Sequence, residues 1–206
     1  MASLKEMIAA SAHMDAIGAW LDGLEHEARV AQVTGLSAGE LAALYALADG
    51  RDVELDHFVP AGAAPGVEVV HHGVNSLPVI GGTFRKRFTR AASGDELLYG
   101  FNDNDGFVSS IGWFTGPGYF AVRPRGCNNP DGRSGSDQLF IDYYEQPEET
   151  PMAGWPDPKP AMGWSAGLVF GQMCDYMWRV SEHVSIGAAW KKGKPVGQYF
   201  ALVRTA

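Results

Sequence analysis

The chain has 206 residues, and 46% of them are apolar, which is the share expected of a globular protein with a substantial core. Its 16 lysines and arginines are outnumbered by 24 aspartates and glutamates, and the net charge of −8 argues against binding to a nucleic-acid backbone. The first residues carry charges in place of an apolar signal, and no stretch reaches the ~20 apolar residues of a membrane-spanning helix. We therefore expect a soluble, cytoplasmic protein with no membrane partner. Two cysteines, Cys127 and Cys174, are too few for a disulfide framework.

Residues 1–58 are predicted to form an N-terminal helical segment. Leucines recur at three-residue spacing within residues 41–47, which places them on one face of a helix. Ser37 and Glu40 precede this run at the spacing of a capping box, in which the serine and glutamate side chains each bond a backbone N–H group of the other residue. A helix is therefore expected to begin directly after Ser37.

A linker rich in proline, glycine and alanine, residues 60–66, separates this segment from residues 67–206. The second part consists of short β-rich runs divided by turn residues, and Leu139, Ile141 and Tyr143 show the alternation of a strand. The candidate strands lie near 67–72, 83–89, 96–102, 108–114, 118–124, 138–145, 167–174, 183–190 and 197–204. So many short strands predict a mainly β protein, an antiparallel lipocalin-like β-barrel that follows the N-terminal helices.

The C-terminal third has a hydrophobic run followed by an acidic residue, a basic residue before valine, a short strand with glycine, and an aromatic strand that ends in arginine. This pattern is carried by Asp175, Arg179, Val180, Ile186, Gly187, Tyr199, Phe200 and Arg204. Residues 73–78 and 82–88 add a glycine-rich opening and a Gly-Thr-Phe-Arg-Lys-Arg-Phe step. Together these stretches resemble the GXWXG-type family of uncharacterised bacterial and fungal proteins, with Asn75 at the place of the family's tryptophan. The resemblance implies a compact β-barrel of lipocalin-like character and supplies no activity.

Two adjacent histidines, His71 and His72, end the first predicted strand and lead into a glycine turn. Successive side chains of a strand point to opposite faces, so one histidine is expected inside the barrel and the other outside. The inner one is a candidate acid/base, metal ligand or hydrogen-bond anchor, because histidine titrates near neutrality. It equally fits a core histidine that bonds to Asn75 or to a backbone carbonyl, and both interpretations stay open.

Aromatic residues fall in or beside most of the predicted strands, where they either fill the core or wall a ligand cavity. For a cavity, Tyr119, Arg123 and Tyr143 are the expected polar anchors. An unpaired buried arginine would be strongly destabilising, so Arg123 needs Asp142 or Asp175 as its partner. If neither carboxylate serves, an anionic ligand is the natural candidate.

Three further motifs have ordinary structural interpretations. The basic run 85–87 is predicted to present alternating solvent-facing charges on an exposed strand face. Residues 102–106 resemble the start of a calcium loop but fit a hairpin turn, since the trailing glutamate is absent. Residues 163–167 spell GxSxG, with Asp175 and His183 following in the order of a hydrolase triad, but a proline-rich loop stands where the preceding strand is required.

The preferred interpretation is a barrel that binds a small, partly apolar molecule in its cavity. This ligand could also carry an anionic group. Its polar contacts would be His71, His72, Asn75, Tyr119, Arg123 and Tyr143, with Asp142 and Asp175 nearby. The alternative is an enzyme of the isomerase or lyase type on the same barrel, with His71 or His72 as the base and with Arg123 and Tyr143 stabilising negative charge. A third option, a protein-interaction module, would need an exposed apolar face on the N-terminal helices. No metal site is predicted, and the identity of any cofactor and the presence of a homo-oligomer are left open.

Overall fold

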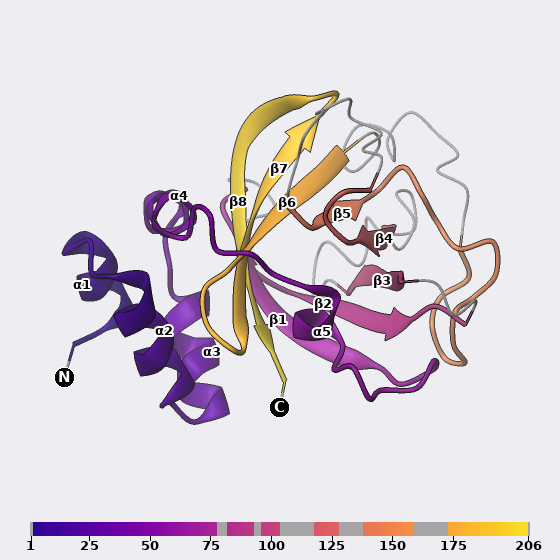
Figure 1. Ribbon diagram of the computed structural model, residues 1–206, viewed down its shortest axis with the longest axis horizontal. Coiled ribbons are helices and arrows are strands. Elements are labelled where there is room, and N and C mark those ends of the chain that lie inside the picture. Colours follow the sequence, from indigo (N-terminus) through magenta and orange to yellow (C-terminus); the bar gives the residue numbers. More distant parts are fainter. Residues whose placement is uncertain are drawn as a thin grey trace.

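The computed structural model describes residues 2–77, 82–92, 96–103, 118–127, 138–158 and 173–205. Within these ranges eight antiparallel strands form a closed barrel, in which each strand pairs with its neighbours in the chain and β1 also pairs with β8 (Figure 1). The strands are β1 (Val69–Asn75), β2 (Gly82–Arg90), β3 (Leu98–Asp103), β4 (Tyr119–Arg123), β5 (Phe140–Asp142), β6 (Met173–Arg179), β7 (Val184–Lys191) and β8 (Lys194–Arg204). The predicted antiparallel, lipocalin-like barrel with preceding helices is confirmed. The predicted strand at 108–114 and residues 167–172 of the one predicted at 167–174 lie outside the described residues.

The strand register identifies the side chains that face the barrel interior. Residues paired directly across neighbouring strands share a face, so His71, Lys86 and Asn102 point the same way. That face carries the apolar cluster enclosed by the barrel, whereas the helices cover the opposite face of β1, β7 and β8. The inward positions include His71, Gly73, Asn75, Phe84, Lys86, Phe88, Leu98, Gly100, Asn102, Phe120, Val122, Ile141, Asp175, Met177, Ser185, Gly187, Phe200 and Leu202.

Three inward-facing glycines make room for three phenylalanine rings on the strands beside them. The pairs are Gly73 with Phe84, Gly100 with Phe120, and Gly187 with Phe200. A Cβ atom on Gly100 would lie 2.5 Å from the Phe120 ring and 2.4 Å from the Arg87 carbonyl oxygen, closer than packed atoms approach. Each glycine therefore allows a large ring to lie over the neighbouring backbone, inside the barrel.

Four helices lie outside the barrel, where the third and fourth pack against β1, β7 and β8 and the first packs against the second and fourth (Figure 1). They are α1 (Leu4–Ala9), α2 (Met14–Asp22), α3 (His26–Thr34) and α4 (Ala38–Leu47). The predicted capping box of α4 is confirmed, since the Ser37 hydroxyl accepts from the Glu40 N–H and the Glu40 carboxylate accepts from the Ser37 N–H. Apolar side chains of the helices share one buried cluster with Val74, Val180, Val184, Ile186, Ala201 and Val203 of the barrel. The helical segment and the barrel thus have a common core, and their division into two domains stays a prediction.

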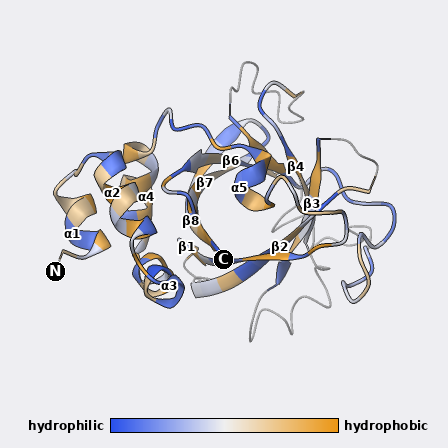
Figure 2. Ribbon diagram, turned by 60° about the horizontal axis from the view of Figure 1, so that its bottom comes forward, coloured by the Kyte–Doolittle hydropathy of each residue, from blue (hydrophilic) through white to orange (hydrophobic). Residues whose placement is uncertain are grey.

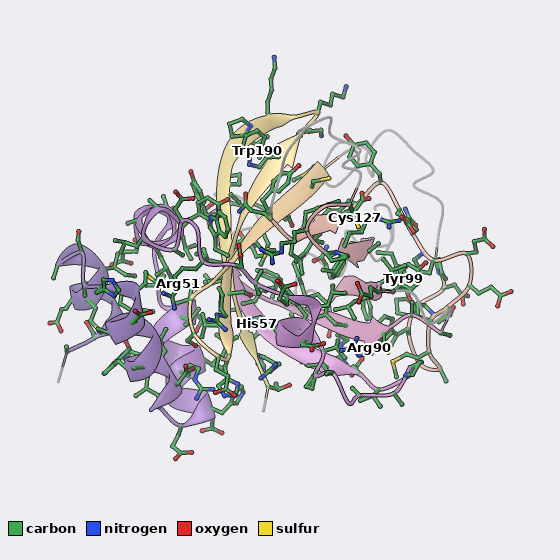
Figure 3. The ribbon with its side chains drawn as sticks, in the orientation of Figure 1. Arg51, His57, Arg90, Tyr99, Cys127 and Trp190 are labelled. Carbon is green, nitrogen blue, oxygen red and sulfur yellow. The ribbon has the colours of Figure 1, made fainter. Side chains whose placement is uncertain are left out.

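A single helical turn, α5 (Leu55–Phe58), closes one end of the barrel, and Figure 2 shows it within the ring of strands. The Phe58 side chain is fully buried, and its ring stacks on that of His71 with 5.7 Å between the centroids. Arg90 of β2, labelled in Figure 3, donates a hydrogen bond to the Val59 carbonyl directly after this turn. These contacts hold the turn against the first two strands.

In the part of the chain that the structure describes, no single helix is long and apolar enough to cross a membrane. α3 and α4 meet the length and composition required only as a pair, with a bend of 110° at the break between them.

Candidate functional site

The most unusual side chain in the barrel is a buried lysine. Lys86 lies on the inner face of β2 and is 2% exposed, and its Nζ donates hydrogen bonds to Asn102 Oδ1 at 2.8 Å and to the Tyr143 hydroxyl at 2.5 Å. The sequence-based interpretation of residues 85–87 as solvent-facing charges is therefore wrong for Lys86. It describes only Arg85 and Arg87, which point outward to the carboxylate of Asp103.

Aromatic rings surround the Lys86 ammonium group. Its Nζ lies 4.6 Å from the ring centroid of Phe120, 5.1 Å from Tyr143, 5.2 Å from Phe200 and 5.8 Å from Phe84. These distances fall within the range in which the negative face of an aromatic ring attracts a cation. The three phenylalanines are those that lean over inward-facing glycines, so the glycine positions place the rings around the lysine.

One carboxylate balances this charge inside the barrel. Asp175 faces inward from β6 and is 4% exposed, and its negative charge favours the protonated form of Lys86. Burial acts in the opposite direction and dominates, so the pKa of Lys86 is lowered from 10.5 to about 8. Burial, followed by the charge of Asp175 and hydrogen bonding to it, raises the pKa of Tyr143 well above its ordinary value, against a weaker opposing effect from Asn102. Lys86, Asn102, Tyr143 and Asp175 are called the Lys86 cluster from here on.

The Lys86 cluster has the groups needed to bind or transform an oxygen-containing molecule. The Lys86 ammonium and the Tyr143 hydroxyl are donors for a carbonyl or carboxylate oxygen. The amine is also a base whose pKa lies near neutrality, in contact with a phenol that holds its proton. The walls around these groups are apolar, which is the usual composition of a small-molecule site.

The two histidines divide between the faces of β1 as predicted. His71 is fully buried inside the barrel, where its Nε2 and the Phe58 carbonyl oxygen are 3.0 Å apart and its ring meets that of Phe88 edge-on. Burial lowers the pKa of His71 to about 3, so it is neutral at pH 7. His72 points outward, with its ring centroid 5.8 Å from that of His26 on α3. These contacts fit the core-histidine interpretation better than a role as base.

Tyr119 and Arg123 lie on the outer face of β4, and their expected position on the inner wall is wrong. The inner positions of this strand belong to Phe120 and Val122. The Tyr119 hydroxyl donates to the Pro156 carbonyl at 2.7 Å. Met152 and Trp155 pack beside Tyr119 on this side of the barrel. The outer face of β4 is therefore buried at Tyr119 and Ala121, although it ends in Arg123.

The expected carboxylate partner of Arg123 is present. Its guanidinium donates to the Glu145 carboxylate, and its Nε lies 3.8 Å from Asp142, which also faces outward and accepts from the Tyr144 N–H. Because these carboxylates compensate the charge of Arg123, no anionic ligand is required at this residue. The second partner considered for it, Asp175, belongs to the Lys86 cluster instead.

Asn75, predicted as a ligand contact, is the last residue of β1. Its Oδ1 accepts a hydrogen bond from the Leu77 N–H, two residues further along the chain, at 2.9 Å. Within the described residues, no group of three or more histidine, cysteine, aspartate and glutamate side chains is placed to hold a metal ion. Residues 104–106 of the calcium-like motif and 163–167 of the GxSxG motif lie outside those ranges.

Lys86 is the functional candidate that sequence reasoning missed, although a signal for it exists. Phe84, Lys86 and Phe88 alternate with Arg85 and Arg87, so a strand that buries its phenylalanines must also bury the lysine. Because all three residues of the run 85–87 are basic, the alternation of inward and outward side chains is not apparent from their charge.

Comparisons with known proteins return no match. No family model, no curated protein and no solved structure matches the chain. The resemblance to the GXWXG-type family therefore stays a prediction, and the functional argument rests on the geometry of the barrel.

Proposed function

We propose that the barrel binds a small, partly apolar molecule whose acceptor oxygen is held by the Lys86 cluster. The observation that carries this proposal is the burial of the Lys86 ammonium group among the rings of Phe84, Phe120 and Phe200. Eight-stranded barrels are wide enough to hold one small ligand, which makes the fold compatible with this role.

A buried lysine is an unfavourable way to fill a core. Removing an ammonium group from water is strongly destabilising even when a carboxylate stands nearby, whereas methionine has a similar volume and carries no such penalty. Lys86 is therefore best explained by a task that needs an amine. Holding a ligand oxygen is the simplest such task, and the Tyr143 hydroxyl, whose oxygen accepts from Lys86, carries one proton of its own at the same point.

The charge balance of the cluster favours a neutral head group. Asp175 already compensates the charge of Lys86, so an added carboxylate would meet a site whose net charge is near zero. A carbonyl oxygen accepts from Lys86 and Tyr143 without this conflict. The anionic option considered from the sequence remains in the proposal as the weaker of the two ligand types.

Calorimetric titration with trans-cinnamaldehyde and trans-cinnamate tests the proposal, since both have a planar apolar skeleton and differ only in the head group. We expect saturable binding that weakens at least tenfold in Lys86→Met, because the buried donor is lost. Lys194→Met is the matched control, since Lys194 is exposed on β8 and should leave binding unchanged. Equal affinity in Lys86→Met and the wild type, or no binding of either compound to the wild type, would refute the proposal.

A second candidate function is acid/base catalysis of isomerase or lyase type. The contact between Lys86 Nζ and the Tyr143 hydroxyl favours it, since a base and an acid meet at one point inside the barrel. This pair suits the role better than His71, whose pKa of about 3 leaves it a weak base. Deuterium uptake by an added aliphatic ketone, followed by NMR in heavy water, would fall in Lys86→Met and persist in His71→Leu if this function is correct.

We further propose that the protein works in the cytoplasm, and its acidic net charge supports the absence of a nucleic-acid partner.

A further inference from the structure

We propose that Lys86 forms a covalent imine with an aldehyde group of its ligand, with the Tyr143 hydroxyl transferring the proton and Asp175 serving as counter-ion. This inference rests on the proposed function, because the aldehyde must first bind inside the barrel. The inference restricts the class of neutral carbonyl ligands to aldehydes, which react with an amine.

The placement of the amine supports this chemistry. Among the described residues, Lys86 is the lysine with a buried side chain, and its Nζ lies in an aromatic surround instead of in water. Imines hydrolyse readily in water, so a site that excludes water stabilises the product. A conjugated aldehyde is the best match, because its planar chain can stack on the phenylalanine rings.

Tyr143 is in position to move the proton that imine formation requires. The Lys86 Nζ lone pair attacks the aldehyde carbon, the carbonyl electron pair moves to oxygen, and that oxygen takes up a proton to give a carbinolamine. The attacking nitrogen, now cationic, returns one proton to the Tyr143 oxygen and regains its lone pair. That lone pair forms the C=N bond while the hydroxyl group leaves as water with a second proton from Tyr143, and the remaining N–H proton of the protonated imine can return to Tyr143. Amine plus aldehyde gives imine plus water, so no oxidant or reductant is needed. The Tyr143 hydroxyl, in contact with Nζ, is the donor on this path.

The electrostatics of the cluster favour both the reacting amine and its product. With the pKa of Lys86 lowered to about 8, about one lysine in ten is unprotonated at pH 7, far more than for an exposed lysine. After reaction the protonated imine retains a positive charge, and Asp175 lies within the same cluster to compensate it. The resting ammonium form of Lys86 and the protonated imine both carry one positive charge opposite Asp175.

Reductive trapping tests the inference. The intact protein is incubated with trans-cinnamaldehyde and sodium cyanoborohydride near pH 7.5, and the reduced adduct adds the mass of the aldehyde less one oxygen atom. Peptide mapping then compares labelling at Lys86 with labelling at exposed Lys194 in the same sample. We expect Lys86 to be labelled at least tenfold faster, and Tyr143→Phe to slow its labelling by about tenfold or more.

Two variants separate the covalent step from binding. Lys86→Met should lose the fast adduct, and so should Lys86→Arg, which keeps a cation but cannot form an imine under these conditions; circular dichroism checks that both are folded. If calorimetry shows that cinnamate and cinnamaldehyde bind to the wild type but Lys86 is labelled no faster than Lys194, the covalent inference is overturned and the proposed function stands. If neither compound binds and Lys86 is not labelled, both are overturned.

Discussion

Replacing Lys86 by methionine should change the stability of the protein in a way that depends on pH, because it removes the cost of a buried ammonium group together with two hydrogen bonds and the attraction to the charge of Asp175. The native pKa of about 8, against an ordinary value of 10.5, measures how much the folded state disfavours the ammonium form. The difference corresponds to about 3 kcal/mol of unfolding free energy that the wild type loses at pH 7. Methionine fills a similar volume and does not carry this loss.

The dependence on pH distinguishes this effect from ordinary repacking. Between pH 8 and 10.5 the unfolded chain binds more protons at this lysine than the folded chain, so wild-type stability rises with pH relative to the variant. The free energy of unfolding of Lys86→Met relative to the wild type should therefore fall by about 3 kcal/mol as the pH is raised from 7 towards 10.5. Hydrogen bonds lost at Asn102 and Tyr143 shift the difference by a similar amount at every pH, so they cancel from this comparison.

Urea unfolding at pH 7.5, 9 and 10, monitored by circular dichroism, gives the two free energies at each pH. Lys194→Met serves as the control, because its exposed side chain should give no such trend. A difference between Lys86→Met and the wild type that stays constant across this range would refute the reasoning, since it would mean that Lys86 is not desolvated in the fold.

Two further predictions concern the rest of the barrel. Gly100→Ala should destabilise the protein by about 1–3 kcal/mol, because its Cβ would meet the Arg87 carbonyl and the Phe120 ring, whereas Gly62→Ala, with open space around it, should be nearly neutral in the same urea titration. Burial lowers the pKa of His71 from 6.5 to about 3, so stability present above pH 6.5 should fall by about 3 kcal/mol between pH 6.5 and 4, as the unfolded chain takes up a proton that the folded chain does not. His71→Leu should flatten this acid limb, and an unchanged slope in that variant would show that other groups cause it.

The barrel could be predicted because its local signals agree. Turn residues separate runs that alternate, and Ser37 with Glu40 marks a helix start without reference to the rest of the chain. The alternation also placed His71 and His72 on opposite faces of one strand. Such features depend on a few consecutive residues, so a single sequence is enough to identify them.

The choice of face on β4 failed for a physical reason. In a strand with one solvent-exposed face, the polar residues mark that face and so identify the buried one. Residues within 144–158 cover the outer face of β4, so this signal is missing there. Tyr119 and Phe120 are therefore both buried, on opposite sides of the sheet. Alternation alone cannot tell the inside from the outside when both are apolar.

The Lys86 cluster could not be assembled from sequence, even though Tyr143 and Asp175 were both considered. Its members come from β2, β3, β6 and the end of β5, and they meet only once the barrel closes in a defined register. Neither the sequence separation of Lys86 and Asp175 nor any local pattern predicts that the members of the cluster come into contact. The alternation around Lys86 could indicate burial, but not its partners.

The core that the helices share with the barrel affects how the chain folds during synthesis. α1–α4 leave the ribosome first, yet the surface that covers them includes β7 and β8, which follow much later in the chain. Until then the nascent helices present uncovered apolar side chains, a state in which chains are open to chaperone capture and self-association. Pairing of β8 with β1 closes the ring and completes this cover in the same event. This pairing therefore both covers the helices and removes the unpaired edges of the sheet.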